Sequence, residues 1–453
     1  MTDMTTPIAD FVRQYQESGA IRFHMPGHKG TPFLGAEPFD ITEIDGADVL
    51  YAADGIIDES EQNASRLFGT AHSFYSTEGS TLAIKAMLSL AITAWRRASK
   101  QARPTVLAAR NVHKAFIYAA AWLDFDVKWL LPEEASHLCA CNVSKEAVGA
   151  ALSDCESEIA AVYLTSPDYL GNLLDIKGIA EVCQKANIPL LVDNAHGAYL
   201  AFHTENRHPI ALGATMACDS AHKTLPVLTG GAYLHIAKGT DPYFVENARA
   251  ALASFASTSP SYLILSSLDL GNRYLSDGYR DKYARCLLTL DEVKKALTHH
   301  GFVLTGDEPL KLVIRVSAIG ASGTSLAAYL KKEGIIAEFA DRDYLVLMVT
   351  PENTDAELWR LSKVLLRYPI ANRYEEKAAL SVTLAPVACS IREAILAPAE
   401  TVSVRDALGR IAASPAVSCP PAIPIVVSGE VITEDAIALF ERYGIDTVSV
   451  IKQ

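Results

Sequence analysis

A lysine and an aspartate in this chain each follow a predicted strand, thirty residues apart. Lys223 lies in the segment Ser220–Pro226, and Asp193 opens the segment Asp193–Gly197 upstream. A lysine amine at such a position can bind the aldehyde of pyridoxal phosphate (PLP), and a carboxylate can keep the pyridine nitrogen protonated. A surface lysine and a helix-capping aspartate are the alternative interpretation of either residue alone. Together the two residues indicate PLP chemistry.

A phosphate site is predicted where a long helix begins. Gly79, Ser80 and Thr81 open this helix, and backbone N–H groups and hydroxyls at a helix amino end favour an anion. A plain helix cap explains the same residues equally well. His113 follows another strand and could stack on the pyridine ring, although most isolated histidines are surface or satisfied core groups.

Three further residues flank the lysine and the aspartate. His196 could contact the Asp193 carboxylate or the cofactor ring, and the Ser220 hydroxyl could bind phosphate. His222 adjoins Lys223 and could bind phosphate or donate a proton, and a spacer role is its alternative.

Composition limits the classes of partner. The chain has 453 residues, half of them hydrophobic, and a net charge of −13. Its length suggests two or three domains, and its charge disfavours nucleic acid and anionic membranes as partners. No apolar run is long enough to span a bilayer and no signal peptide is apparent, so a cytoplasmic protein is expected. Eight scattered cysteines form no CxxC pair, so free thiols and no metal site are expected.

Helical and strand patterns alternate from about residue 61 onward. The predicted strands lie at 105–109, 127–131, 159–165, 189–192, 214–220 and 231–235. Helices between short buried strands indicate an α/β fold with a mostly parallel sheet covered on both faces. Ligands of such sheets bind at the carboxyl ends of the strands, where Thr165, Asp193 and Ser220 fall.

Four segments are expected along the chain. An amino-terminal segment (1–60) contributes to the active site and a large PLP-binding domain follows (61–300). A small α+β domain (301–375) precedes a carboxyl-terminal subdomain (376–453). The change of pattern near residue 302, from long helices to strands around one helix, marks the start of the α+β part.

These motifs together resemble the Orn/Lys/Arg decarboxylase family, PLP enzymes of the aspartate-aminotransferase fold. The resemblance covers nearly the whole chain. The blocks that carry it are Phe23–Gly30, Gly79–Thr81, Arg110–Lys114, Thr165–Tyr169, Asp193–Gly197, Ser220–Pro226, Arg392–Ala394, Ala407–Ile411, Pro420–Pro424 and Gly429–Glu430. Since the chain begins almost directly at the first block, it resembles the short members, which lack an amino-terminal wing domain.

The resemblance implies a role for each matching position. Lys223 would bind the cofactor covalently, Asp193 would face the pyridinium, and His113 would stack on the ring with His196 close by. Ser80, Thr81, Ser220 and His222 would surround the phosphate. The resemblance also implies fold type I, with a seven-stranded sheet, and a homodimer or a multiple of dimers with active sites at the subunit interface.

Three loops depart from the family pattern. The family usually has Gln-Thr where this chain has Gly230-Gly231, and Tyr-Pro-Pro-Gly-Ile-Pro where Cys419 and Ala422 replace the tyrosine and the glycine. The later Pro-Gly-Glu reads Ser428-Gly429-Glu430. Glycines at 230 and 231 suggest a wider pocket, and these departures leave the substrate less defined than the cofactor.

The expected reaction is α-decarboxylation of arginine, lysine or ornithine to a polyamine-type amine and CO2. Lys223 or His222 would protonate Cα, while His28 and Glu430 are candidates for contacting the substrate, Glu430 as a carboxylate for its cation. A surface loop position is the alternative for Glu430. The rival functions are another fold-type-I enzyme, such as an aminotransferase or a lyase, and a catalytically silent regulatory homologue. An aminotransferase needs an arginine for the substrate carboxylate, and no arginine is assigned to that role.

Overall fold

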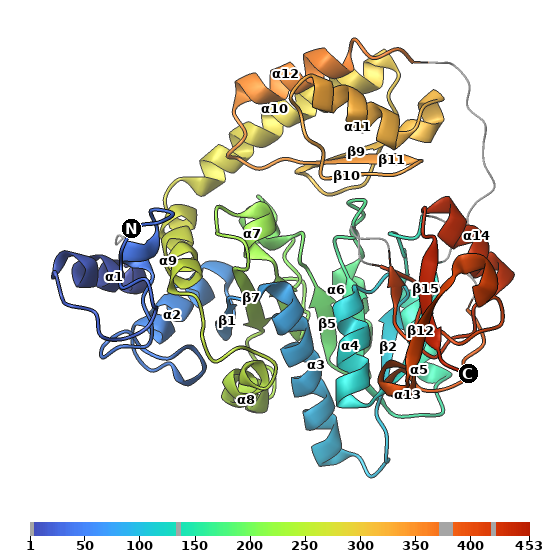
Figure 1. Ribbon diagram of the computed structural model, residues 1–453, viewed down its shortest axis with the longest axis horizontal. Coiled ribbons are helices and arrows are strands. Elements are labelled where there is room, and N and C mark those ends of the chain that lie inside the picture. The colour runs from blue at the N-terminus through green and yellow to red at the C-terminus, as the bar shows by residue number, and fades with distance from the viewer. Residues whose placement is uncertain (1–3, 133–136, 371–383, 418–422) are drawn as a thin grey trace. The chain divides into compact units, whose positions relative to one another are not determined.

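Two compact units make up the chain, and the computed structural model describes residues 4–132, 137–370, 384–417 and 423–453. The first unit contains residues 1–98 and 176–283, and the second contains residues 99–175 and 284–453 (Figure 1). The division into four segments made from the sequence stays a prediction.

The main sheet has seven strands in the order β1-β7-β6-β5-β4-β2-β3. The pairs β2–β3, β2–β4 and β5–β6 are parallel, whereas β7 is antiparallel to both β1 and β6. The mostly parallel seven-stranded sheet is therefore confirmed. Its strands are β1 His72–Ser76, β2 Thr105–Ala109, β3 Asp126–Leu130, β4 Ile159–Thr165, β5 Leu190–Asp193, β6 Met216–Asp219 and β7 Ala232–Ile236.

Strand β1 was not expected from the sequence. Its residues His72–Ser76 include two serines and a histidine, so the segment lacks the apolar run that marks a buried strand. Ser73 is nevertheless fully buried, because its hydroxyl lies 2.8 Å from Nδ1 of His235 on β7 and 2.7 Å from the Thr70 hydroxyl. Partners from a distant strand thus make a polar residue acceptable in this sheet.

Helices of the first unit pack on its strands and on one another. The long helix α3 contacts β6 and β7, and α2 contacts β1; the buried face of α3 is rich in Leu, Ile and Ala, as expected for a helix covering a sheet. The elements are α1 Pro7–Glu17, α2 Ile56–Phe68, α3 Gly79–Ala98, α6 Ile176–Lys185, α7 Ala221–Thr224, α8 Pro242–Ala253, α9 Tyr262–Ser276 and the start of α10 Tyr279–His300. Among the described helices, none is long and apolar enough to cross a membrane.

The second unit contains the α+β part expected after residue 302. A four-stranded sheet of order β10-β11-β9-β8 carries helix α11, and two short two-stranded sheets, β12-β15 and β13-β14, lie nearer the carboxyl end. The helices are α4 Lys114–Leu123, α5 Lys145–Ser153, α11 Gly323–Lys332, α12 Asp355–Leu365, α13 Ile391–Leu396 and α14 Glu434–Arg442. The strands are β8 Leu304–Thr305, β9 Lys311–Arg315, β10 Phe339–Ala340, β11 Tyr344–Met348, β12 Ala399–Ser403, β13 Ala416–Val417, β14 Pro424–Val426 and β15 Thr447–Ile451.

A buried ion pair joins the start of β9 to the loop after β4. The Lys311 ammonium lies 2.7 Å from Glu308 and donates to the backbone carbonyl of Asp168 at 3.2 Å. The Asp168 carboxylate accepts from the backbone and the side chain of Asn172. Because all of these charged side chains are buried, each needs its partner to remain in the interior. The seven described cysteines form no disulfide, and Cys419 lies outside the described residues.

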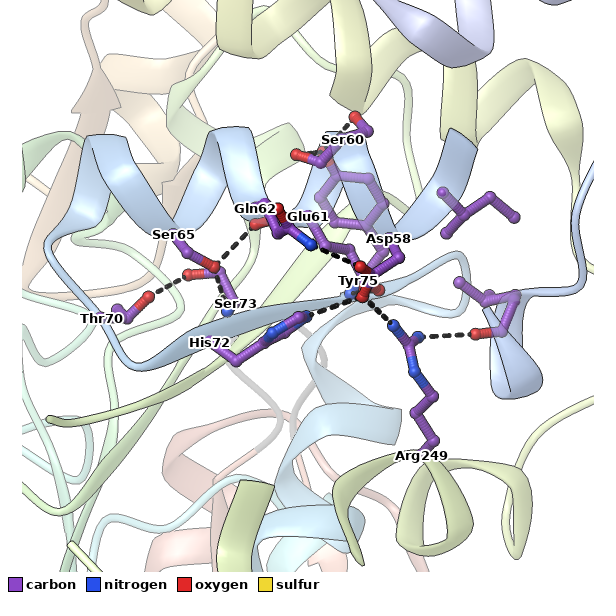
Figure 2. Close-up of polar contacts among 12 residues, drawn as sticks. Asp58, Ser60, Glu61, Gln62, Ser65, Thr70, His72, Ser73, Tyr75 and Arg249 are labelled. Atoms are coloured by element: carbon purple, nitrogen blue, oxygen red, sulfur yellow. Dashed lines mark hydrogen bonds and ion pairs between the residues drawn. The ribbon is translucent and has the colours of Figure 1, made fainter. Parts of the chain in front are cut away.

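The carboxylate of Glu61 is fully buried and joins α2, β1 and α8. Its Oε2 accepts from Arg249 at 2.7 Å and lies 3.0 Å from His72 Nε2, and its Oε1 accepts from the backbone N–H of Tyr75 at 2.9 Å. Figure 2 shows the Arg249 guanidinium and the His72 ring directed at the Glu61 carboxylate, with Asp58 beside it. Since Arg249 also bonds to Asp58 at 2.9 Å, one guanidinium is shared by the two carboxylates and supplies the counterion of the buried Glu61.

A second buried carboxylate fixes the amino-terminal helix. Asp269 on α9 accepts from the backbone N–H of Ala9 in α1 at 2.9 Å and from the Ser60 hydroxyl at 2.5 Å. Burial raises the pKa of Asp269 to about 6, although the bonds from Ala9 and Ser60 act in the opposite direction. Asp269 therefore binds a proton more tightly in the folded than in the unfolded chain.

Replacing Asp269 by asparagine should change how stability depends on pH. A carboxyl group whose pKa is raised by folding stabilises the protein at low pH and loses that contribution as pH rises from about 4 to about 6. Asp269→Asn should remove this slope, worth up to about 3 kcal/mol over the interval. Urea unfolding at several pH values measures it, and Glu434→Gln, at an exposed carboxylate, is the control. Equal slopes for wild type and Asp269→Asn would contradict the assignment.

Candidate functional site

Two neighbouring strands of the first unit place the aspartate and the serine of the predicted site. β5 and β6 are parallel, with Asp193 opposite Cys218, so both strands end at the same edge of the sheet. Asp193 is buried, and its Oδ1 accepts from the backbone N–H of Ala195 at 3.1 Å. Ser220 follows β6 directly and lies at the amino end of the short helix α7. Asp193 and Ser220 therefore lie at the same edge of the sheet.

The predicted cofactor lysine contacts a histidine. Nζ of Lys223 lies 3.0 Å from Nε2 of His196. Lys223 is half-buried, and His196 is buried. The sequence suggested that His196 contacts either the Asp193 carboxylate or the cofactor ring. In the structure its Nε2 lies beside the lysine amine, with which it can exchange a proton.

The amino end of α3 brings together two hydroxyl groups. Ser220 Oγ donates to Ser80 Oγ at 2.8 Å, although the residues are 140 positions apart. Gly79, at φ +69°, begins the twenty-residue helix, and its backbone N–H donates to the carbonyl of Gly230 at 2.7 Å. Thr81 is exposed on the first turn of the same helix. Two hydroxyls and the first turn of a long helix form a set of donors suited to a dianion.

His222 contacts one of the two glycines, Gly230 and Gly231, at which the chain departs from the family pattern. Nδ1 of His222 lies 2.9 Å from the carbonyl of Gly231, and burial lowers the pKa of His222, with Lys223 adding to the effect. Gly230 has φ +102°, and a Cβ there would lie 2.8 Å from the Thr77 carbonyl; at Gly231 a Cβ would lie 2.3 Å from a Val227 methyl. A positive φ and a close backbone carbonyl therefore account for Gly230, and a close side-chain methyl accounts for Gly231.

The residues of the first unit fit PLP in the chemistry of their donors. A lysine amine can bind the aldehyde, the buried Asp193 carboxylate can face the pyridinium nitrogen, and the hydroxyls of Ser80 and Ser220 can bind the phosphate. All three kinds of group come from the ends of β5 and β6 and from the start of α3. This is the end of a parallel sheet at which ligands bind.

Two predicted site residues lie in the second unit. His113 begins α4, where its Nδ1 accepts from the backbone N–H of Ala115 at 3.2 Å. Glu430 is buried and ion-paired: its Oε2 lies 3.2 Å from an Arg110 nitrogen and accepts from the backbone N–H of Val427 at 2.7 Å. Glu430 is thus not a solvated loop residue, and its carboxylate already holds a cation of the protein.

The remaining sequence predictions fall in loops. His28 lies 3.2 Å from the Asp40 carboxylate, and its Nδ1 accepts from the backbone N–H of Gly30. Ser428 is buried beside Glu430. Cys419 and Ala422 lie outside the described residues.

A buried network next to the site was missed by the sequence reasoning. Asp219, His208 and His235 are fully buried and in hydrogen-bond contact, and Asp219 directly precedes Ser220. The three residues are brought together by the antiparallel pairing of β6 with β7 and by a turn before β6. A charged residue within a predicted buried strand was the available signal, because such a residue needs a partner.

Comparison with known proteins agrees with the geometry. The family model described as Orn/Lys/Arg decarboxylase, major domain, matches residues 6–306, and the model of its C-terminal domain matches residues 372–443. The chain is 28% identical over 463 residues to "Arginine decarboxylase" of Halalkalibacterium halodurans, covering 96% of this chain and 92% of that protein. It is 27% identical over 470 residues to "Arginine decarboxylase" of Bacillus subtilis (strain 168), with coverages of 97% and 93%.

Solved structures show the same fold. The lysine decarboxylase LdcF of Francisella novicida superposes with a TM-score of 0.80 at 18% identity, over 99% of this chain and 82% of that one. Lysine decarboxylase A from Pseudomonas aeruginosa gives 0.78 at 19% identity, over 98% and 80%. A serine palmitoyltransferase from Sphingomonas wittichii gives 0.56 at 14% identity, over 80% of this chain and 83% of that one, so the fold is shared with this enzyme as well. The matched models cover most of the sequence, and the chain belongs to the Orn/Lys/Arg decarboxylase family.

Proposed function

We propose that this protein is a PLP-dependent decarboxylase that converts a basic L-amino acid into a polyamine-type amine and CO2 in the cytoplasm. The observation that carries the proposal is the arrangement of Lys223, Asp193 and the Ser80–Ser220 pair at one sheet edge, in a chain of this family. Arginine is the first substrate to test, because two relatives named arginine decarboxylase align over nearly the whole chain.

Each residue of the first unit has one proposed task. Lys223 binds the cofactor through Nζ, and Asp193 holds a proton on the pyridine nitrogen. Ser80 and Ser220 bind the phosphate together with the first turn of α3. When bound, PLP takes up the electron pair that CO2 leaves on the substrate Cα.

Protonation of Cα is assigned to Lys223 rather than to His222. Burial lowers the pKa of His222, so its imidazole is mostly neutral at pH 7 and is a poor acid. Lys223 carries exchangeable protons on Nζ, and His196 Nε2 lies 3.0 Å from that atom. His196 can accept or return a proton as the lysine changes its charge during turnover.

Release of CO2 from arginine, lysine and ornithine tests this function directly. The wild type should release CO2 from at least one of the three, and Lys223→Ala should release none. A protein that shows the visible absorbance of bound PLP but acts only as a transaminase, or not at all, would contradict the proposal. A scan of visible absorbance also distinguishes a decarboxylase from a catalytically silent homologue, because the silent homologue need not bind the cofactor covalently.

Asp193→Asn should separate cofactor binding from turnover. An amide can still accept the hydrogen bond from Ala195, but it cannot hold the pyridine nitrogen protonated. We expect PLP to remain bound and kcat to fall by several powers of ten. Steady-state kinetics and PLP titration measure the two effects. Near-native turnover by this variant would remove Asp193 from the role.

Glu430→Gln should act on stability more than on substrate binding. Loss of the carboxylate leaves Arg110 buried without its countercharge, at a cost of about 3 kcal/mol. Urea unfolding measures this loss, and Glu441→Gln, at an exposed pair with Arg405, is the control. KM for the preferred substrate should stay within about threefold. A tenfold or greater rise in KM without loss of stability would instead assign Glu430 to the substrate cation.

A homodimer is supported by the amino-terminal segment. Ile21, Phe23, Phe33 and Leu34 are 77–95% exposed in the single chain, and clustered exposed apolar side chains are typical of an interface. These residues lie within the amino-terminal segment 1–60, which we expect from the sequence to contribute to the active site.

Substitution of the exposed apolar residues should weaken the dimer. The double variant Phe23→Ser, Leu34→Ser should dissociate at higher protein concentration than wild type and lose activity in parallel, because burying both side chains stabilises association. Leu288→Ser, at a 69% exposed leucine of α10, is the control. Light scattering and activity over a dilution series measure the effect. A wild-type monomer that decarboxylates at full rate would defeat this prediction.

A further inference from the structure

The fully buried cluster of Asp219, His208 and His235 lies directly behind the turn that carries the cofactor lysine. Oδ2 of Asp219 is 3.0 Å from Nε2 of His208 and 3.1 Å from Nε2 of His235. All three residues are 0% exposed, and the two imidazole rings pack edge to face with centroids 5.1 Å apart. One carboxylate oxygen is therefore held by two rings that come from different parts of the chain.

The hydrogen bonds assign the protons of this cluster. The backbone N–H of Ile210 donates to Nδ1 of His208, so that nitrogen carries no proton and Nε2 carries one. Nε2 of His208 therefore donates to Asp219 and offers no lone pair to a metal ion. Burial alone would raise the pKa of Asp219, but His208 and His235 bring it well below its ordinary value. Asp219 is thus an ionised carboxylate whose charge is stabilised by hydrogen bonds from two imidazole N–H groups.

The other oxygen of Asp219 reaches the second cofactor turn. Oδ1 accepts from the side-chain amide of Asn194 at 2.7 Å, and the backbone N–H of Asn194 donates to the carbonyl of Cys218 at 2.9 Å. Asn194 directly follows Asp193, and Asp219 directly precedes Ser220. The buried side chain of Asp219 consequently connects the turn that carries Asp193 to the turn that carries Ser220.

We propose that Asp219 is a positioning residue that fixes the Asp193 turn against the Ser220–Lys223 turn. The inference rests on the proposed function, because it gives these turns their role as the cofactor site. Both oxygens are needed: one receives the two imidazole donors and the other receives the amide of Asn194. An asparagine at 219 would keep one acceptor for the histidines but present an NH2 group to the Asn194 amide, so the bond to Asn194 would survive only if that amide turned over.

The surroundings make the arrangement rigid. The His235 ring lies 4.5 Å from the ring of Phe68 and 5.2 Å from that of Tyr233, measured between centroids. These close aromatic contacts and the complete burial of both histidines restrict rotation of the imidazole rings. A change at Asp219 should therefore be transmitted to the cofactor turns rather than absorbed locally.

Asp219→Asn tests the proposal in the full-length protein. We expect PLP to bind about tenfold to a hundredfold more weakly and kcat to fall at least as much, with KM within about threefold. The matched control is Asp269→Asn, which also removes a fully buried carboxylate of the first unit but touches neither cofactor turn. It should keep PLP affinity within about twofold, whatever its effect on Tm. Equal losses of PLP affinity in the two variants would overturn the proposal.

A milder variant decides the matter if Asp219→Asn does not fold. Asn194→Ala removes only the bond to Oδ1 and keeps both imidazole bonds. It should weaken PLP about tenfold while lowering Tm no more than Asp269→Asn does. PLP affinity within twofold of wild type would overturn the proposal. A wild type that binds PLP without releasing CO2 would contradict the proposed function, and the comparison of PLP affinities would still decide the role of Asp219.

Discussion

β5 and β6 lie side by side in parallel, with Asp193 opposite Cys218, and this register decides what the site can do. It brings the ends of the two strands to one edge of the sheet. Asp193 lies at the end of β5, and Ser220 and Lys223 follow the end of β6. A slip of one residue would turn Asp193 to the opposite face of the sheet. The contact of Lys223 with His196 depends on this pairing, whereas the contact of Ser220 with Ser80 depends on β7, which pairs with both β1 and β6.

Buried carboxylates hold the first unit together in three different electrostatic ways. Glu61 is neutralised by Arg249, and Asp219 receives neutral imidazole donors. Asp269 accepts from a backbone N–H and from a hydroxyl, and burial raises its pKa to about 6. The environment of each carboxylate thus determines whether it carries a charge at neutral pH and which elements it joins. In Asp219 this structural role meets the cofactor site, because its neighbours in sequence are the cofactor residues themselves.

Much of the site could be predicted from sequence because its residues follow strands directly. Lys223, Asp193 and Ser220 are local to strand ends, and the helix at Gly79 begins at a recognisable break. The fold class followed from the alternation of helices and buried strands. Strand β1 was missed because its buried Ser73 depends on partners on β7 and in the preceding turn, and its His72 on Glu61 of α2. The Asp219 network and the Arg110–Glu430 pair were missed for the same reason: their partners are distant in sequence, and only the folded chain brings them together.

Covalent trapping would show directly whether Lys223 carries the cofactor. The full-length protein would be incubated with PLP and reduced with borohydride, which converts the link between the lysine and the cofactor into a stable amine. Peptide mapping by mass spectrometry would then locate the added phosphopyridoxyl group. The account predicts a single modified peptide containing Lys223 of the Ser220–Pro226 segment. Modification at another lysine, with Lys223 unmodified in a protein that decarboxylates, would contradict it.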